Sequence, residues 1–553
     1  MKTFSDLFHD LDCLTKTNQK LDRLVSYFEN APTEDAIWVC WFLSGNRIKG
    51  VVKTSELRRF VSDRVKLPIW LIEECHDRVG DLAETISLLV ENKENSKVNS
   101  LNESIRKFIL PLKGMDSDER KVLLFQAWDE LSGRDMLPFH KLLTGGFRMG
   151  VSKGNLCKAL ALVSKVEPAV IAQRIAGNWS CENLSMEQIL NPEKDSAISI
   201  HKPYPFCLAS PLQEEVSSIG DVNQWQVEWK WDGIRAQLLT TGGGSGMIWS
   251  RGEESIEESF PELLKCIPYL PAGICMDGEI LAWGREGLRP FSRLQKRLGR
   301  KSPGPTIQKK ESVRFQAYDL LRIGGEDIRG VCLEERRRKL EEVVGSLPQN
   351  LPMGISPLIN AKTWSEFEER RMESRDRGVE GFMLKKKKSN YESGRVKGSW
   401  YKWKVDPYLA DMVVVSAQLG HGKRANLYTD YSLAVWNDSG ELVTVAKAYS
   451  GLTNEEIQEV DRFVRKNITG KFGPVRGVKP VLVFEIAFEG AQTSGRHKSG
   501  IALRFPRIQR WRKDKKPEEA DSLETMRGFA GMSSKPETVN GLKTDEDGNL
   551  LLF

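Results

Sequence analysis

The chain has 553 residues, of which 40% are hydrophobic and 29% are charged, and its formal net charge is +6. At about 150 residues per domain, this length predicts roughly three to four domains, and the composition is typical of a globular protein. No segment approaches the ~18 consecutive apolar residues of a transmembrane helix, and residues 1–12 lack the apolar core of a signal peptide, so we exclude a membrane-spanning protein and expect no membrane partner.

Residues 1–195 are predicted to be helical, because leucines and other apolar residues recur there at spacings of three, four and seven, which places them on one face of a helix. A glycine-rich segment at 144–154 interrupts this pattern. Its glycines would let backbone N–H groups approach a ligand closely, and Arg148, Ser152 and Lys153 are candidate phosphate contacts. An ordinary loop between two helices is the alternative interpretation of this segment.

After the helical region, a proline-containing linker precedes a strict alternation of polar and apolar residues from 225 to 232. Such alternation predicts a strand. Its two-residue period places Glu228, Lys230 and Asp232 on one face and tryptophans on the other. A salt-bridged lysine on a partly exposed strand would be a purely structural explanation. A lysine between two carboxylates, followed by Gly233, also suits a binding site.

Strand-like and helix-like segments mix up to about residue 407. From 408 to 516, short strands separated by turn signals, such as Asn-Asp-Ser-Gly at 437–440, predict a small barrel. Residues 517–553 carry eight acidic and three basic residues with few large apolar ones, so we expect a flexible tail there.

Seven short motifs follow one another between residues 230 and 515. They are Lys230-x-Asp232-Gly233, Ser250-Arg251, Asp277-Gly278-Glu279, Tyr318-Asp319, Glu380-Gly381-x-Met383-x-Lys385, Lys402-x-Lys404 and a basic segment at 502–515. In this order and at these spacings, the motifs resemble those of the covalent nucleotidyltransferase superfamily and, within it, those of the ATP-dependent DNA ligases. The helical region resembles, through less specific signals, the DNA-binding domain of the larger family members.

The resemblance implies a multidomain α+β fold. An all-helical DNA-binding domain would span 1–195, a mixed α/β nucleotidyltransferase domain of antiparallel sheets 203–407, and an OB-fold β-barrel 408–516, followed by the tail. The implied enzyme seals nicks between a 3′-hydroxyl and a 5′-phosphate in DNA repair, replication and recombination. Its implied partner is nicked duplex DNA, bound by a monomer that works beside separate repair proteins in a bacterial or archaeal cytoplasm, near the nucleoid.

A ligase of this kind forms a lysine–AMP phosphoramidate, and the resemblance assigns this catalytic role to Lys230. The attacking amine must be neutral, so burial and nearby cations are expected to favour its uncharged form. Lys402, Lys404 and a bound Mg²⁺ or Mn²⁺ are the candidate cations. Glu279 and Glu380 would supply hard oxygen ligands for the metal. The expected cofactors are therefore ATP and this divalent cation.

The same resemblance assigns the remaining site residues. Glu228 would bind the adenine amino group, with Tyr318 and Met383 on the two faces of adenine. Arg235 and Arg251 would contact ribose or phosphate, and Glu279, Arg395, Lys402 and Lys404 would also contact the nucleotide. In the barrel, Arg510, Arg512, Asp514 and Lys515 would orient the leaving pyrophosphate. In the helical region, Arg148, Ser152 and Lys153 would bind DNA phosphates.

Two other interpretations stay open. An RNA ligase or a capping-type guanylyltransferase shares these motifs, although capping enzymes usually lack a large helical N-terminal domain. A non-catalytic nick-binding protein could keep the scaffold, although the intact set of motif lysines and glutamates argues against it. Other classes fail on the sequence, which has no Gly-x4-Gly-Lys-Ser/Thr loop, no complete nucleophile elbow, no Cys-x-x-Cys pair and no cysteine beyond Cys332 for the zinc site of NAD-dependent ligases.

Overall fold

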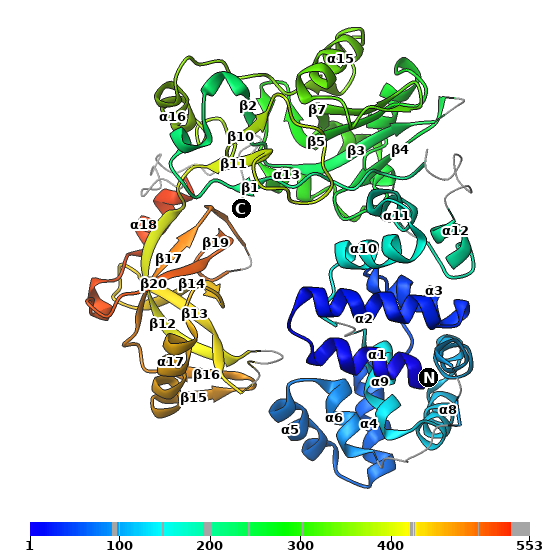
Figure 1. Ribbon diagram of the computed structural model, residues 1–553. Helices are drawn as coiled ribbons and strands as arrows, with labels where there is room; N and C mark the ends of the chain where they lie inside the picture. Colours follow the sequence, from blue (N-terminus) through cyan, green and yellow to red (C-terminus); the bar gives the residue numbers. More distant parts are fainter. Residues whose placement is uncertain are drawn as a thin grey trace. The chain divides into compact units, whose positions relative to one another are not determined.

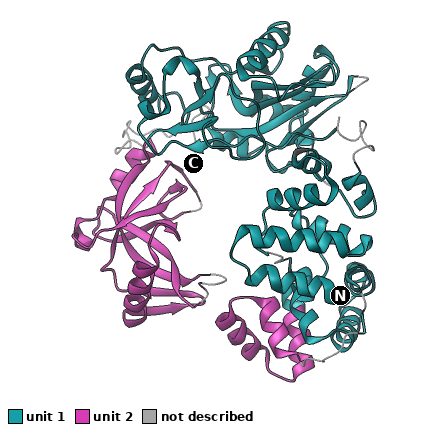
Figure 2. Cartoon of the chain, in the orientation of Figure 1, with its two compact units in different colours: residues 1–56, 91–405 teal, residues 57–90, 406–553 magenta. Residues whose placement is uncertain are grey.

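The computed structural model describes residues 1–531 except for 91–96, 99, 146–148, 178, 192–200, 242–243, 301, 421–423, 425 and 496. The chain forms two compact units, one of residues 1–56 with 91–405 and the other of residues 57–90 with 406–553 (Figure 2). Within the described ranges, no helix is both long enough and apolar enough to cross a membrane.

Helices make up the N-terminal region, as expected, and the described part of residues 1–191 contains no strand (Figure 1). The helices are α1 Lys2–Cys13, α2 Thr17–Asn30, α3 Thr33–Leu43, α4 Thr54–Val65, α5 Ile69–Val79, α6 Leu82–Leu89, α7 Leu101–Ser104, a π-helical turn Ile105–Ile109, a 3-10 turn Leu110–Lys113, α8 Ser117–Glu130, α9 Gly133–Thr144, α10 Lys153–Ser164, α11 Pro168–Arg174 and α12 Met186–Leu190. The predicted period is that of their buried faces; α1, for example, buries Phe4, Leu7 and Leu11.

Two sheets form the central region. The strands are β1 Ser210–Pro211, β2 Trp225–Trp229, β3 Ile234–Thr240, β4 Gly246–Ser250, β5 Cys275–Gly284, β6 Gly287–Leu288, β7 Val313–Ile323, β8 Glu326–Asp327, β9 Met353–Ile355, β10 Gly381–Lys386 and β11 Trp400–Lys404. One sheet has the order β1-β11-β10-β2, and the other has β4-β3-β5-β7-β8 with β6 beside β5 and β9 beside β7. Pairing is antiparallel except between β1 and β11 and between β7 and β9.

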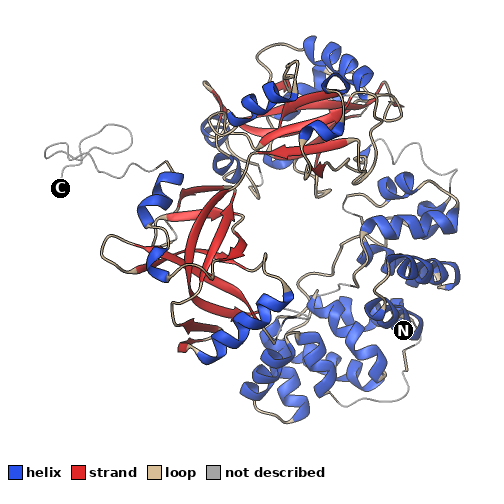
Figure 3. Ribbon diagram, turned by 60° about the vertical axis from the view of Figure 1, so that its left-hand side comes forward, coloured by secondary structure: helices blue, strands red, loops and turns tan. Residues whose placement is uncertain are grey.

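The central region also contains helices, some of which pack against the sheets (Figure 3). They are α13 Phe291–Gln295, α14 Pro305–Lys310, α15 Leu333–Gly345 and α16 Trp364–Met372, with 3-10 turns at Val216–Ile219, Val222–Gln224, Glu257–Ser259 and Leu263–Tyr269. Leu340 of α15 shares a core with Phe315 of β7. Phe367 of α16 shares another with Val227 of β2 and Phe382 of β10.

The chain passes from one sheet to the other at residues 230–233, between β2 and β3. Strand β2 ends at Trp229, so the predicted alternation stops one residue before Lys230. The expectation that all the tryptophans share the apolar face is wrong for Trp231, whose Nε1 donates to Ser356 Oγ at 3.0 Å. At Gly233, an added Cβ would lie 2.4 Å from the Ile280 carbonyl oxygen. Close strand packing therefore requires this glycine.

The C-terminal region is rich in strands. Its elements are β12 Tyr408–Leu419, β13 Tyr428–Trp436, β14 Leu442–Ala448, α17 Asn454–Lys466, β15 Ile468–Phe472, β16 Val475–Val478, β17 Val483–Phe488, β18 Gly490–Thr493, β19 Ile501–Arg504, β20 Arg507–Trp511, a 3-10 turn Pro517–Glu519 and α18 Leu523–Phe529. Strand β12 joins the sheet together, because its first half pairs with β17 and its second half with β13 and β16. The predicted turn forms, with Asn437 Oδ1 accepting from the Ser439 and Glu441 N–H groups.

The start of the expected flexible tail is ordered. Residues 517–531 contain α18, whose Leu523 and Met526 are buried in the same core as Phe484 of β17 and Val460 of α17. The sequence expectation failed here because two apolar side chains one helical turn apart are enough to dock a short helix, although the segment around them is acidic. The rest of the tail lies outside the described residues.

Candidate functional site

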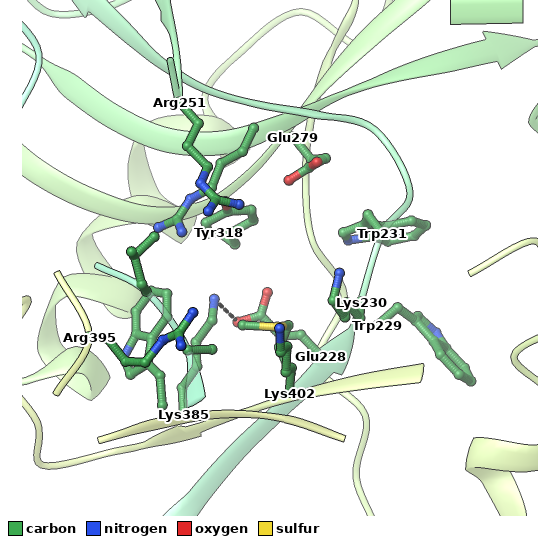
Figure 4. A pocket seen from close by; sticks show the side chains of 15 residues that line it. Glu228, Trp229, Lys230, Trp231, Arg251, Glu279, Tyr318, Lys385, Arg395 and Lys402 are labelled. Atoms are coloured by element: carbon green, nitrogen blue, oxygen red, sulfur yellow. Dashed lines mark hydrogen bonds and ion pairs between the residues drawn. The ribbon is translucent and has the colours of Figure 1, made fainter. Parts of the chain in front are cut away.

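A cavity of about 180 Å³ is lined by residues from both central sheets (Figure 4). Its lining residues are Leu208, Ala209, Glu228, Trp229, Lys230, Trp231, Arg235, Arg251, Glu279, Tyr318, Met383, Lys385, Arg395, Trp400 and Lys402. Every residue that was predicted to contact the nucleotide, except Lys404, therefore lines this cavity. The seven motifs lie far apart in the sequence, and six of them contribute lining residues.

Lys230 leaves β2 and enters this cavity, where its side chain is 22% exposed. Its Nζ lies 2.5 Å from Oε2 of Glu380, and the Lys404 Nζ lies 3.4 Å from the same oxygen. The backbone fixes this contact, because the Lys230 N–H donates to the Gly381 carbonyl and the Glu380 N–H donates to the Lys230 carbonyl. Glu380 thus contacts the predicted nucleophile directly, and Lys404 contacts Glu380, although neither residue is among those that line the cavity.

Positive charge gathers beside Lys230. Burial lowers the pKa of Lys402, and the neighbouring ammonium groups of Lys404 and Lys230 and the Arg395 guanidinium lower it further. Repulsion among these cations favours a polyanion at this end of the cavity, because a phosphate group would relieve it. Arg251, on the turn that follows β4, adds another cation to the cavity wall.

Glu279 lies on β5, opposite Arg235 of β3. Burial raises the pKa of Glu279 to about 8, and Lys230 and Arg235 offset part of that effect. Within the described ranges, no group of three or more His, Cys, Asp or Glu residues could hold a metal ion. Two carboxylates at a polyphosphate site nevertheless fit Mg²⁺, which commonly takes one or two protein carboxylates together with substrate phosphate oxygens.

Tyr318 of β7, which is 8% exposed, and Met383 of β10 both line the cavity, and we call the part of the cavity that these two residues line the slot. Glu228 lies next to this slot, where its Oε1 accepts hydrogen bonds from Lys385 Nζ and Gln226 Nε2, both at 2.8 Å. Lys385 was not among the predicted site residues. It is the last residue of the Glu-Gly-x-Met-x-Lys motif, and this position in the motif could have identified Lys385 as a site residue.

The Arg235 guanidinium is held by the protein itself. Asp277 accepts two hydrogen bonds from it, at 3.2 and 2.6 Å. Tyr391 donates to the same carboxylate at 2.7 Å. Burial disfavours the charged guanidinium, but Asp277, Tyr318 and Tyr391 together outweigh this effect and hold the pKa of Arg235 well above its usual value. The first residue of the Asp-Gly-Glu motif therefore orients Arg235, and Tyr391 and Trp400 are site neighbours that no sequence signal had marked.

Asp319 follows Tyr318 in its motif but faces the other side of β7, as consecutive strand residues do. Its carboxylate accepts from Arg336 of α15 at 2.8 and 2.9 Å, and both side chains are completely buried. The second residue of this motif thus attaches α15 to the sheet that carries Tyr318.

The predicted DNA contacts of the helical region have partners within the chain. Ser152 caps α10 by accepting from the Asn155 N–H at 3.2 Å. Lys153 forms an ion pair with Glu253 and donates to the Ile175 carbonyl at 3.3 Å. Arg148 lies outside the described residues. In the described part of this segment, Ser152 and Lys153 thus make the contacts expected of an ordinary connection between two helices.

The four predicted pyrophosphate-orienting residues form a charged cluster in the C-terminal region. We call this the Asp411 cluster; it comprises Asp411, Glu485, Arg510, Arg512, Asp514 and Lys515. Asp411 Oδ2 lies 2.9 Å from Arg512 Nη1 and 2.6 Å from Lys515 Nζ, while Arg510 pairs with Glu485 at 3.0 Å. The hydrogen bond from Arg512 lowers the pKa of Asp514 to about 2.

Comparisons with known proteins match nearly the whole chain. Residues 1–161 match the family model described as DNA ligase N terminus, 207–404 the ATP dependent DNA ligase domain and 424–515 the ATP dependent DNA ligase C terminal region. A probable DNA ligase of Koribacter versatilis (strain Ellin345) is 31% identical, over 92% of this chain and 93% of that protein. A DNA ligase of Thermococcus fumicolans is 26% identical, over 96% and 98%. The solved structure Pmar-Lig_PreS3 has the same fold, with a TM-score of 0.61 at 16% identity over 92% and 99% of the two chains.

Proposed function

Because this chain belongs to the ATP-dependent DNA ligases, we propose that it seals nicked duplex DNA through a covalent AMP adduct on Lys230. The observation that carries the proposal is the position of the Lys230 amine. It lies in the cavity that Glu228, Tyr318 and Lys402 also line, 2.5 Å from the Glu380 carboxylate. Of the described lysines that line the cavity, Lys230 alone forms an ion pair with a partly exposed carboxylate: Lys385 pairs with the buried Glu228, and Lys402 lies mainly among cations.

In the first step, Lys230 Nζ attacks the α-phosphorus of ATP. A phosphorus–nitrogen bond forms, the bond to the oxygen that bridges the α- and β-phosphates breaks, and pyrophosphate leaves. The amine must lose a proton, and the Glu380 carboxylate at 2.5 Å is its nearest acceptor. Lys402 and Arg395 would offset the charge that develops on the phosphate oxygens.

Glu279 and Glu380 would hold a divalent cation, Mg²⁺ or Mn²⁺, once phosphate oxygens complete its ligands. When bound, such a cation polarises the phosphate and neutralises part of its charge. Glu279 suits this role because burial raises the pKa of its carboxyl to about 8 and Lys230 and Arg235 offset only part of this effect, so that a bound cation would stabilise its charged form. The Asp411 cluster would supply the cations that orient the leaving pyrophosphate.

In the second step, the 5′-phosphate of the nick attacks the adduct phosphorus, which releases Lys230 and forms an adenylylated DNA end. In the third step, the 3′-hydroxyl attacks that end, the phosphodiester forms and AMP leaves. We assign DNA binding to a helical domain at 1–195 and to a barrel domain from 408, which α18 extends to 531. In the sequence, these two domains precede and follow a catalytic domain at 203–407. We further propose that the enzyme acts as a monomer in replication, repair and recombination.

The test is incubation with α-labelled ATP and Mg²⁺, followed by detection of an acid-labile AMP–protein adduct and of sealed nicks. We expect Lys230→Ala to abolish the adduct, whereas Lys386→Ala, which removes an exposed lysine of the neighbouring strand β10, leaves it unchanged. Sealing by Lys230→Ala at the wild-type rate would refute the mechanism. Labelled GTP and nicked RNA, offered in parallel, distinguish the guanylyltransferase and RNA ligase alternatives.

A further inference from the structure

An ion pair between two neighbouring strands forms part of the cavity wall. Glu228 of β2 and Lys385 of β10 are joined by a contact of 2.8 Å between Oε1 and Nζ (Figure 4), and their side chains are only 1% and 2% exposed. A buried ion pair adds little stability compared with well-packed apolar residues, because both charges must be removed from water. Its position in a ligand cavity therefore favours a role in recognition.

The two carboxylate oxygens of Glu228 are not equivalent. Oε1 accepts from both Lys385 and Gln226. For Oε2, the described part of the chain supplies no hydrogen-bond donor, and Glu228 lines the cavity. Lys385 and Gln226 thus fix the carboxylate in one orientation and leave one acceptor for a ligand.

Lys385 is equally constrained. Its Nζ lies 4.2 Å from the centroid of the Tyr318 ring and 4.6 Å from that of Trp400, which holds the ammonium beside the slot for the base. An ammonium carries three donor hydrogens, of which Glu228 uses one. Beside the slot, the cavity wall therefore presents an acceptor, Glu228, next to a donor, Lys385.

We propose that the Glu228–Lys385 pair selects the purine, with Lys385 as a specificity-determining residue that accepts a 6-aminopurine and rejects a 6-oxopurine. This inference rests on the proposed function. Adenine has a donor amino group at position 6 and an acceptor at N1, which matches the acceptor and donor of the pair. Guanine and hypoxanthine have an acceptor oxygen at position 6 and a donor at N1, so the same pair opposes them.

Removal of the Lys385 charge is expected to change the hydrogen-bonding character of the Glu228 carboxyl group. A buried carboxylate without its counter-ion is costly and takes up a proton, which turns one of its oxygens into a donor. Such a donor suits the 6-oxo group. Lys385→Met, which keeps the side-chain length but not the charge, is therefore expected to bind ATP less well and to use ITP better.

The experiment measures adduct formation on Lys230 with ATP and with ITP, which differs from ATP at position 6 and in the protonation of N1. We expect Lys385→Met to lower the ratio of the two kcat/KM values about tenfold or more, mainly through the KM for ATP, since hydrogen bonds to charged groups discriminate on this scale. Lys385→Arg keeps the charge and is expected to keep most of the preference. Lys386→Met, a matched change on the exposed side of β10, keeps the full preference.

Equal losses with both nucleotides in Lys385→Met, with the ratio unchanged, would mean that Lys385 only supports the fold, and would overturn the proposal. If Lys385→Met forms no adduct with either nucleotide, Glu228→Gln carries the same test, because the new amide nitrogen can donate to the 6-oxo group; an unchanged ratio there would also overturn the proposal. Absence of any adduct in the wild-type protein would instead refute the proposed function.

Discussion

Asp319→Asn separates a structural from a catalytic role at the second position of the Tyr318-Asp319 motif. The change keeps the shape of the side chain and removes its charge. Arg336 would then be left completely buried without the carboxylate that it now contacts at 2.8 and 2.9 Å. We expect the central domain to lose stability, whereas nucleotide binding persists at temperatures where the domain stays folded.

The magnitude follows from the burial of both partners, which are 0% exposed. Removing one member of a fully buried pair leaves an uncompensated charge and typically costs about 3–5 kcal/mol. For a domain of this size, about 1 kcal/mol corresponds to roughly 2–4 °C in Tm. The expected decrease in Tm is therefore on the order of 10 °C.

Differential scanning calorimetry of the full chain measures this decrease, and the transition that ATP shifts upward identifies the central domain. At 20 °C, we expect the kcat/KM for adduct formation to stay within about threefold of the wild-type value. The double variant Asp319→Leu with Arg336→Met replaces the pair by apolar groups and is expected to recover most of the lost Tm.

A decrease below about 2 °C would contradict the calculated cost of the unpaired guanidinium. A large rise in the KM for ATP with an unchanged Tm would mean that Asp319 acts on the nucleotide. A double variant as unstable as the sum of its single changes would show that the two residues do not act as a pair.

Three further outcomes are expected. Glu380→Ala should slow adduct formation about a hundredfold or more without changing the circular dichroism spectrum; an unaltered Mg²⁺ dependence would exclude it as a metal ligand. Burial lowers the pKa of His140, which accepts from Trp128 at 2.8 Å, to about 3. The unfolded chain therefore binds a proton below pH 6.5 that the folded chain does not, and the free energy of unfolding falls by about 1.4 kcal/mol for each pH unit of acidification. The difference in urea midpoint between wild type and His140→Gln should narrow between pH 7 and pH 5, and a constant difference would contradict the burial of a neutral His140. Asp411→Asn releases the cations of the Asp411 cluster, and adduct formation at sub-saturating ATP should rise; a fall would show that Asp411 positions these cations for catalysis.

Much of the site could be predicted because its chemistry depends on residue types at fixed local spacings. The alternation around Glu228 and Lys230 indicated a strand, and β2 covers its first five residues; Lys230 lies just beyond the end of β2, and both side chains line the cavity. The turn at 437–440 was equally local, since one asparagine side chain closes it.

The remaining features depend on which strands become neighbours, and strand pairing between distant segments could not be predicted from a single sequence. Lys385 meets Glu228 only because β10 pairs with β2 in a register that sets Met383 opposite Glu228. Tyr391 reaches Asp277 across 114 residues of chain. Asp277 and Asp319 belong to the motifs, yet their partners are the side chains of Arg235 and Arg336. A motif records that a residue is needed, but not whether the ligand or the scaffold needs it.

Helix α18 has a practical consequence for recombinant production of this protein. The family-model match ends at residue 515, and a truncated protein designed from that match would end at the same residue. Such a protein would lack Leu523 and Met526, and the apolar surface of β17 and α17 that they cover would face water. Exposed apolar patches promote aggregation, so a truncated version intended for crystallisation or assay would stay in solution better if it retained residues up to 531.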